Sequence, residues 1–376
     1  MEDTFINHNS FTFPGINSAL VGLSKEILDK GVWRENNGFQ KETANSCLEL
    51  PYPVCVEITN PRSREVMLEE RKWNRILPHA ESLWILLGWN NLDDFTGRYV
   101  KNLYTFADDE HIWRAGYGPR MRGFTGVKTP YIRGIDSHEQ PSELVEVDQL
   151  KYVVETLKRE PTSRQALITI HDPGKDSDLG LKTKDQPCTR SLHFMVVNGR
   201  LNCYVTMRSN DIINGFSAVN VFNFTFMQEY VSYLTGIPMG KYYHIAHNLH
   251  VYENQLKLLI TLSKISMDKA VTLDESCVFV NEMRYGEYFS YFTNLMNHVS
   301  YESFIKEAKK TYNYIDRLYN LNKNKDLTED EVKQLIYDAG SDLCPFFFDW
   351  FRVFGDWGKR VKPLFQPAYE KYTLKK

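Results

Sequence analysis

The sequence predicts an α+β fold in which helices pack against a mixed β-sheet. Strand-like and helix-like patterns alternate along the chain without the regular crossovers that a purely parallel sheet requires. Two alternating apolar segments flank Asn198-Gly199, a dipeptide that strongly predicts a tight hairpin. The C-terminal part is mostly helical, so we expect a core over residues 1–265 and an extension over residues 266–376 that packs on it.

The first third of the chain contains one expected strand and two expected helices. A helix is predicted over residues 18–30, and residues 47–59 have a strand pattern that two prolines interrupt. Residues 78–89 form an apolar run long enough for a buried helix, with Glu81 in its first turns. The segment 104–124 is punctuated by glycines, which predicts a loop.

The middle of the chain contains a helix, a strand and the hairpin. Asp148 can cap a helix whose apolar residues recur at helical spacing, and Pro161 ends that helix. Residues 164–170 have a strand pattern, and residues 192–196 and 201–207 are the two arms of the hairpin. Further helices are expected over residues 219–235, 300–320 and 328–339.

The composition excludes some classes of protein. The 376 residues carry a formal net charge of −3, so the chain is not a basic nucleic-acid coat, and we expect no direct nucleic-acid binding. The six cysteines form no C-x-x-C pair, which predicts free thiols in a reducing compartment and no metal site. No secretory signal pattern and no run of ~18–20 apolar residues is present, so we expect a cytoplasmic protein without membrane contact.

Cys188 is the first candidate for chemistry. It follows a proline at the start of the hairpin, and Arg208 stands at the hairpin's far end. A reactive thiol needs a lowered pKa, usually from nearby cations, and Arg208 would favour the thiolate if the hairpin returns it beside Cys188. The alternative is that Cys188 is a small buried hydrophobic residue, as most cysteines are.

Charged side chains elsewhere are candidates for binding and proton transfer. Arg208-Ser209 and Arg164 carry the groups that bind an oxyanion, although a surface arginine needs no such role. Glu81 stands inside an apolar helix, where burial would raise its pKa and suit it to act as an acid or base. The alternative is that Glu81 caps a neighbouring element.

Uncharged side chains could orient a ligand. Asn220 could hydrogen-bond a planar, amide-like ligand edge, or else satisfy a backbone group. His250 and Tyr252 would project to one side of an extended segment, although a lone histidine there is more often structural.

The order of these residues resembles the thymidylate synthase superfamily over roughly residues 45–260. Before the cysteine, the matching motifs are Glu81-Ser-Leu-Trp-Ile-Leu-Leu-Gly88, Tyr117-Gly118 and Pro161-Thr-Ser-Arg164. From the cysteine onward they are Pro187-Cys188, Arg208-Ser209-Asn210-Asp211, Gly215, Asn220 and His250-Val251-Tyr252-Glu253-Asn254. The resemblance implies a mixed sheet with packed helices and a homodimer that forms sheet to sheet.

The resemblance also implies a role for the residues that would bind and attack the substrate. Cys188 would add to C6 of a pyrimidine deoxynucleoside monophosphate, whose C5 then accepts the one-carbon unit of 5,10-methylenetetrahydrofolate. Arg208 and Ser209 would hold the 5′-phosphate, and Arg164 would reach the phosphate in the partner subunit's site.

The remaining matched residues would surround the base, sugar and folate. Asn220 would read the base edge, and His250 and Tyr252 would meet the 3′-hydroxyl of the sugar. Glu81 would move protons around the base and folate. Tyr117 and Asp211 would line the site beside the cysteine and the folate.

The chain departs from the family pattern at several positions. Matching Asn220 to the base-reading asparagine requires one additional residue before it, and a match without that residue would use Val219. Thr189 stands where the synthases have histidine, and Asn248 stands where the family usually has aspartate. The chain also continues for about 100 residues beyond the matched region, without the short apolar tail that closes over the folate in synthases.

The resemblance leaves the product, the base and the activity open. Only Trp113 precedes Tyr117 where the synthases have two tryptophans, which favours an open site and addition of water, as in the phage-type hydroxymethylases. The alternative is a thymidylate synthase that releases dihydrofolate. Asn220 favours dUMP as substrate, with dCMP as the alternative. A further alternative, from a different class of function, is that the chain is an inactive relative that only binds a nucleotide.

Overall fold

A six-stranded mixed sheet forms the centre of the computed structural model, which describes residues 9–35, 46–105, 107, 111–127, 143–178, 183, 185–277 and 300–373. The strand order is β1 (Ser10–Phe13), β4 (Val54–Ile58), β11 (Met239–Ala246), β9 (Arg200–Met207), β8 (Thr189–Val197) and β7 (Leu167–Thr169). The pairs β1–β4 and β11–β9 are parallel and the other pairs are antiparallel. The mixed sheet and the α+β class predicted from the sequence are therefore confirmed.

Two smaller sheets accompany the central one. The first contains β10 (Asn210–Asp211), β12 (Leu249–Tyr252), β3 (Cys47–Glu49) and β2 (Val32–Arg34) in that order. The second pairs β5 (Phe124–Val127) with β6 (Leu144–Val147).

The strand pattern of residues 47–59 is divided between two sheets. Its first part is β3 and its second part is β4, with Pro51 and Pro53 between them. Proline has no N–H to donate to a ladder, so each proline interrupts the pairing and the chain changes sheet. The prediction of one interrupted strand was therefore wrong in placing both halves together.

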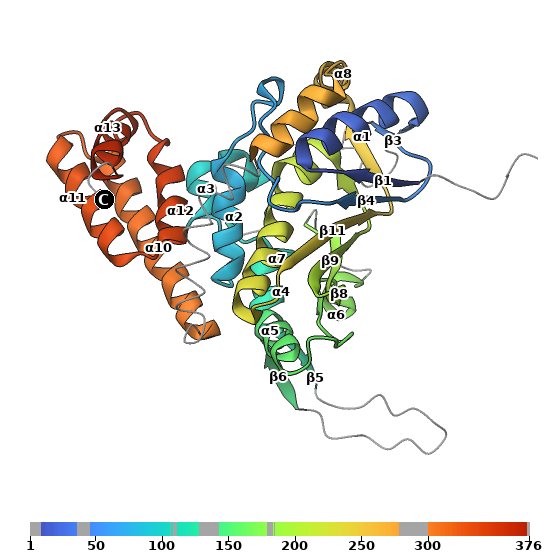
Figure 1. Cartoon of the computed structure of the whole chain (residues 1–376), viewed down its shortest axis with the longest axis horizontal. Coiled ribbons are helices and arrows are strands. Elements are labelled where there is room, and N and C mark those ends of the chain that lie inside the picture. The colour runs from blue at the N-terminus through green and yellow to red at the C-terminus, as the bar shows by residue number, and fades with distance from the viewer. Residues whose placement is uncertain are drawn as a thin grey trace, which may run out of the picture.

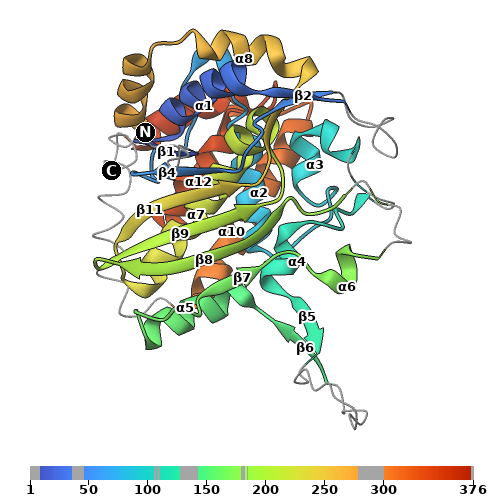
Figure 2. The same ribbon diagram turned by 90° about the vertical axis from the view of Figure 1, so that its right-hand side faces the viewer.

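The predicted hairpin is present as β8 and β9. Asn198 and Gly199 have φ angles of 51° and 72°, the left-handed conformation that a two-residue turn of this type requires at both positions. Side chains on one face of the hairpin are fully buried, while those on the other face are partly exposed. In Figure 2, β8, β9 and β11 lie in front, with α2 (Ile76–Leu86) and α7 (Val221–Thr235) behind them.

Helix α7 is the central helix of the core. It is buried along nearly its whole length and follows directly from the π-helix η5 (Ile212–Asn220). The prediction of a helix over residues 219–235 is confirmed, although the helical path begins seven residues earlier than predicted, counting from 219 back to 212. The helix ends at Gly236, whose positive φ of 73° suits a glycine C-cap.

The helix that residues 18–30 predict is α1 (Ile16–Lys30), and its N-terminus is capped from far along the chain. Gly15 at the N-cap has no side chain to offer. Asp274 accepts hydrogen bonds from the backbone N–H groups of Asn17 (2.8 Å) and Ser18 (3.0 Å) instead. Asp274 lies in a helix over residues 267–277, so that segment packs with the core.

The segment 104–124 is not the continuous loop that its glycines predicted. It contains α4 (Tyr117–Arg122), which begins after Gly116 and has Pro119 in its first turn. A helix of six residues is too short to show an apolar periodicity, which explains why the pattern missed it. The helix after Asp148 is α5 (Gln149–Arg159), capped by the Asp148 side chain as predicted.

Several short elements complete the core. They are η2 (Glu69–Arg71), α3 (Thr96–Tyr99), η3 (Lys101–Thr105), α6 (Pro173–Asp176), η6 (Glu253–Gln255) and α8 (Leu256–Ser263). No helix in the described part of the chain combines the length and apolar character needed to cross a membrane.

Four helices over residues 300–373 lie on the far side of α2 from the sheet (Figure 1). They are α10 (Tyr301–Lys323), α11 (Glu329–Asp342), α12 (Pro345–Gly355) and α13 (Lys362–Thr373). Trp350 on α12 donates from Nε1 to the carbonyl of His79 on α2 (3.0 Å), and its ring lies 4.6 Å from that of Phe226 on α7. The helical segment thus packs on the helices that cover the sheet.

Candidate active site

The hairpin brings Cys188 and Arg208 together. Cys188 directly precedes β8 and Arg208 directly follows β9, and the backbone N–H of Arg208 donates to the carbonyl of Cys188 (2.9 Å). The Arg208 guanidinium donates to the carbonyls of Pro187 (3.1 Å) and Gln186 (3.2 Å). The arginine side chain is therefore held against the segment that carries the cysteine.

Two effects act in opposite directions on the pKa of Cys188. Burial raises the pKa of the Cys188 thiol above its ordinary value, while the positive charges of Arg208 and Arg190 counteract part of that rise. Arg208 is beside the sulfur as expected, but burial outweighs its charge. The free protein therefore holds Cys188 as a thiol at neutral pH, and a nucleophilic step requires transfer of its proton.

Glu81 and Cys188 both lie near Tyr117. Burial raises the pKa of Glu81 to about 7, and the amide of the neighbouring Asn223 opposes part of the rise. The pKa of Tyr117 is raised mainly by burial, and the neighbouring charges of Cys188 and Glu81 add to it. The hydroxyl of Thr189 donates to the Tyr117 hydroxyl (2.9 Å), so the residue that replaces a histidine is bonded to this group.

A second set of side chains lies next to Ser209. Asn248 donates from Nδ2 to Glu49 (2.6 Å), and its Oδ1 is 3.4 Å from Ser209 Oγ and 2.7 Å from His250 Nδ1. Because the Asn248 oxygen can only accept, His250 carries its proton on Nδ1 and leaves Nε2 as an acceptor. Asn248 therefore sets the tautomer of His250 from the position where the family usually has aspartate.

Asp211, His250 and Tyr252 lie on paired strands. Asp211 on β10 is the register partner of His250 on β12, and the His250 and Tyr252 rings are 5.0 Å apart. Burial raises the pKa of Tyr252 to about 12, and the nearby charges of Asp211 and Cys188 contribute. Burial also lowers the pKa of His250, which keeps the imidazole neutral.

Asp211 caps the π-helix and retains capacity to bind a ligand. It accepts from the backbone N–H groups of Ile213 (2.7 Å) and Asn214 (3.2 Å) and from the Asn214 side chain (2.8 Å). A carboxylate offers about four acceptor positions, so the described residues leave one for an N–H group of a ligand.

The segment before Asn220, where the predicted match to the family requires one additional residue, is a π-helix. A π-helix has one more residue between bonded backbone groups than an α-helix, so it can absorb an insertion without a loop. It spans Ile212–Asn220 and contains Gly215, and Asn220 is its last residue. Asn220 accepts from Nδ2 of Asn210 (2.8 Å), and both side chains are buried.

Arg164 is separate from this cluster. It stands on the exposed segment before β7, where its backbone carbonyl lies 3.0 Å from Nε2 of His193. The structure therefore brings together the predicted site residues except Arg164.

A family model described as thymidylate synthase matches residues 20–278, which include all of these side chains. The chain belongs to the thymidylate synthase family. The predicted relationship to this family of one-carbon transferases is therefore confirmed.

Relatives of this family member include two phage proteins named deoxyuridylate hydroxymethyltransferase. The one from Bacillus phage SP01 is 34% identical over 211 residues, 56% of this chain and 51% of that protein. The one from Delftia phage PhiW-14 is 29% identical over 224 residues, 57% of this chain and 56% of that protein. The matched segment thus spans only about half the length of these relatives.

Cellular thymidylate synthases are also similar to it. The thymidylate synthase of Mannheimia succiniciproducens is 27% identical over 241 residues, 64% of this chain and 80% of that protein. The solved structure of thermostable thymidylate synthase A from Bacillus subtilis superposes with a TM-score of 0.51 at 20% identity. The superposition covers 66% of this chain and 84% of that one, and it supports the common fold.

Two residues near the site of this family member were not found from the sequence. Arg71 donates to the carbonyl of Ile213 (2.8 Å), and its half-buried guanidinium lies close to Asp211. Asn223 accepts a hydrogen bond from Ser82 (2.8 Å), and its amide lowers the pKa of the neighbouring Glu81 against the effect of burial. Neither residue belongs to a motif, although an asparagine one turn after Asn220 in a buried helix is a usable signal.

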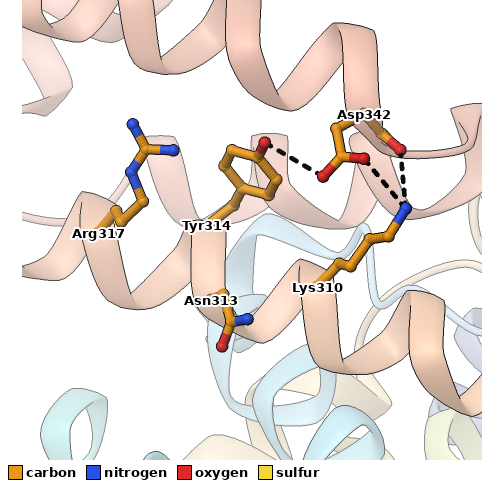
Figure 3. A pocket seen from close by; sticks show the side chains of 5 residues that line it. All are labelled: Lys310, Asn313, Tyr314, Arg317 and Asp342. Atoms are coloured by element: carbon orange, nitrogen blue, oxygen red, sulfur yellow. Dashed lines mark hydrogen bonds and ion pairs between the residues drawn. The ribbon is translucent and has the colours of Figure 1, made fainter.

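A surface hollow in this family member lies far from Cys188, between α10 and α11. It is lined by Lys310, Asn313, Tyr314, Arg317 and Asp342 (Figure 3). Its lysine is paired with Asp342 (3.0 Å), and its arginine is paired with Asp338 (3.0 Å). These cations are therefore engaged in holding the two helices together.

Proposed function

We propose that the protein hydroxymethylates C5 of dUMP, with 5,10-methylenetetrahydrofolate as the one-carbon donor. The observation that carries the proposal is the grouping of Cys188, Glu81 and Tyr117 in a chain 34% identical to a phage deoxyuridylate hydroxymethyltransferase. The thiol is the nucleophile that the reaction needs, and Glu81 titrates near neutral pH, where an acid–base group is most effective.

Cys188 would begin the reaction by adding to C6 of the uracil. Its proton would leave as the sulfur bonds C6, and the electrons of the C5–C6 double bond would move toward O4. The Asn220 amide would hydrogen-bond O4 and stabilise the charge that develops there. Arg208 and Ser209 would hold the phosphate, so that C6 lies within reach of the sulfur.

Methylenetetrahydrofolate would supply the one-carbon unit that C5 accepts. Asp211 would bind an N–H group of the pterin through its remaining acceptor position, and Tyr117 would line the same space. Glu81 would exchange protons with the base. Loss of the C5 proton and cleavage of the bond between the one-carbon unit and the folate nitrogen would release tetrahydrofolate and leave an exocyclic methylene at C5. Water would then add to that methylene, and the electrons returned to C5 would expel the Cys188 sulfur from C6, which gives the 5-hydroxymethyl nucleotide.

A thymidylate synthase reaction is the second candidate. The similarity to the synthase of Mannheimia succiniciproducens, which extends over 80% of that protein, favours it. The two reactions share their steps as far as the exocyclic methylene, and they differ in whether hydride or water reaches it. Trp113 is the one tryptophan in the segment before Tyr117, which supports access of water.

One assay separates the two reactions. The protein is incubated with dUMP and methylenetetrahydrofolate, dihydrofolate is followed by absorbance, and the nucleotide is identified by mass. The proposal predicts a nucleotide heavier by CH₂O without dihydrofolate. A nucleotide heavier by CH₂ together with dihydrofolate would establish the synthase reaction instead. Binding of dUMP without turnover would identify an inactive relative.

The protein would act as a homodimer that forms through the central sheet. The face of β8, β9 and β11 turned away from α7 (Figure 2) is only partly buried. The Tyr204 and Tyr243 rings stack on each other at 4.7 Å on these strands. Leu167 and Val197 are 42% and 40% exposed at this sheet. A partly exposed face that carries large apolar and aromatic side chains is suited to burial against a second copy, to which the exposed Arg164 would reach.

A further inference from the structure

Three hydrogen bonds connect the core of the sheet to the base-reading residue. The hydroxyl of Tyr242 is 2.8 Å from Nδ1 of His244, and Nε2 of His244 is 2.9 Å from Oδ1 of Asn210. Asn210 then donates from Nδ2 to Oδ1 of Asn220 (2.8 Å). All four side chains are buried, with Tyr242 and His244 fully enclosed.

The donor and acceptor in each of the three hydrogen bonds follow from the fully buried Tyr242 hydroxyl, where the series begins. Burial lowers the pKa of His244 to about 3, so the ring is neutral, with one nitrogen donating and the other accepting. Among the described residues, the Tyr242 hydroxyl has His244 as its one hydrogen-bond partner, so it donates to Nδ1. Nε2–H must then donate to Asn210, whose Nδ2 donates to Asn220.

The surroundings leave little room for the Asn210–Asn220 bond to move. A Cβ on Gly215 would lie 2.5 Å from Nδ2 of Asn210 and 2.9 Å from Oδ1 of Asn220, so only glycine fits against the bond. The Phe216 ring packs edge-on against His244 at 4.9 Å and 88°. Both residues come from the π-helix, which holds the bond in place.

We propose that Tyr242, His244 and Asn210 are positioning residues that fix the amide orientation of Asn220 and thereby select uracil over cytosine. The inference rests on the proposed function, in which Asn220 reads the base. The three residues do not touch the nucleotide. They act by determining which end of the Asn220 amide carries the oxygen.

The fixed orientation matches only one of the two bases. With its oxygen toward Asn210, Asn220 can accept from N3–H of uracil with its second lone pair and donate from Nδ2 to O4. Cytosine has an acceptor at N3 and a donor at N4, so it requires the amide to be reversed. Reversal would set two N–H groups against each other at Asn210, and a buried group without a partner costs about 1–3 kcal/mol.

Tyr242→Phe tests whether the hydroxyl sets this orientation. Without the hydroxyl, His244 has one unpaired nitrogen in either tautomer, so both orientations of the amides become similar in energy. Dissociation constants of dUMP and dCMP are measured by calorimetry without folate. The ratio of the dCMP constant to the dUMP constant is expected to fall about tenfold from its wild-type value. The matched control is Tyr243→Phe, which removes the same hydroxyl one residue along β11 and should preserve the ratio.

Asn210→Asp tests the same inference by reversing the orientation of the Asn220 amide. A carboxylate at this position can accept from His244 but cannot donate, so Asn220 must turn its Nδ2 toward it and present its oxygen to the base. The variant should bind dCMP more tightly and dUMP more weakly than the wild-type protein. If Asn210 had a merely structural role, the variant would bind both nucleotides more weakly and by a similar factor.

The outcomes separate this inference from the proposed function. An unchanged ratio in both Tyr242→Phe and Asn210→Asp, in proteins that still bind dUMP, would overturn the inference. A wild-type protein that binds dUMP with a ratio sensitive to both variants, but that forms no product, would support the inference and refute the proposed reaction. A wild-type protein that binds neither nucleotide would refute both.

Discussion

Glu81 and Cys188 show how burial sets the protonation of the reacting groups. Both pKa values are raised mainly by burial, although Arg208 lies beside the thiol and the amide of Asn223 lies beside the carboxyl. A protonated thiol and a carboxyl that titrates near pH 7 form a pair that can exchange a proton through a bound nucleotide or water. Burial therefore keeps Cys188 protonated, and Glu81 partly protonated, at neutral pH before a substrate binds.

The stability of the protein should depend on pH through Glu81. Its pKa rises from 4.5 unfolded to about 7 folded, a difference worth about 3 kcal/mol. A raised acid pKa stabilises the fold below pH 4.5, and that contribution is lost as the pH rises through about 7. Urea unfolding of the wild type and Glu81→Gln should therefore show the wild type losing stability relative to the variant over this range. A constant difference between the two proteins would contradict the assigned burial.

Cys188→Ala should abolish product formation while leaving dUMP binding measurable. The phosphate and base contacts do not involve the sulfur, so only the covalent step is removed. Cys55→Ala is the matched control, because Cys55 is a partly exposed thiol on β4 outside the site. Product formation by Cys188→Ala at the wild-type rate would refute the assignment of the nucleophile.

The sequence predicted the position of Cys188 better than its chemistry. The Asn198-Gly199 turn indicated the hairpin, and with it the return of Arg208 toward Cys188. A shift of register between Thr189 and Ser191, which the pattern does not show, completes that approach. The protonation state did not follow, because the burial of Cys188 comes from segments distant in sequence. The bond from Thr189 to Tyr117 was missed for the same reason, since 72 residues separate the two.

At the scale of elements, the sequence pattern could not predict the π-helix or the capping of α1 by Asp274. The apolar residues of 212–220 suit an α-helix equally well, and only the hydrogen bonding distinguishes the wider form. The capping of α1 by Asp274 joins residues 257 positions apart, and nothing near Gly15 signals it. By contrast, α5 followed from local periodicity and capping, and α2 and α7 followed from the length of their apolar runs.

Gly215→Ala provides a test of the π-helix. Helix propensity alone predicts that alanine stabilises a helix by up to ~1 kcal/mol. The structure predicts the opposite, because the new Cβ would lie 2.5 Å from Asn210. We expect a loss of about 1–3 kcal/mol in urea unfolding, with weaker dUMP binding. Gly126→Ala, where an added Cβ meets nothing within 4 Å, is the control, and a stabilised Gly215→Ala would show that the packing is wrong.

At the scale of the whole molecule, residues 300–373 support the helix that carries Glu81. Trp350 donates to the backbone carbonyl of His79, and the two rings lie 4.5 Å apart at a tilt of 55°, on the flank of α2 turned away from the sheet. Trp350→Ala should destabilise the protein by about 3–5 kcal/mol in urea unfolding. Tyr337→Ala, whose side chain is 61% exposed on α11, should change stability little. Equal effects of the two would show that α12 contributes nothing to the core.

Mixing two variants tests the proposed homodimer. Cys188→Ala lacks the nucleophile, and Arg164→Ala lacks the arginine that would reach the partner. In mixed dimers, one of the two sites would regain both groups, so about a quarter of all sites should become active. Activity is measured at low dUMP concentration, where loss of Arg164 has most effect. Failure of the mixture to exceed the sum of its components would show that Arg164 serves its own subunit or none.

The widened turn before α7 also determines where a chain of this family can change in length. Each residue added to an α-helix rotates everything beyond it by about 100°, which would displace buried side chains such as Phe224 and Phe226 from their packing partners in the core. A π-helix absorbs the added residue before Val221, so α7 keeps its orientation in the core. One insertion could thus be inherited without repacking the centre of the protein. A comparison that permits no insertion would assign Val219 to the base and classify a competent site as a degenerate one.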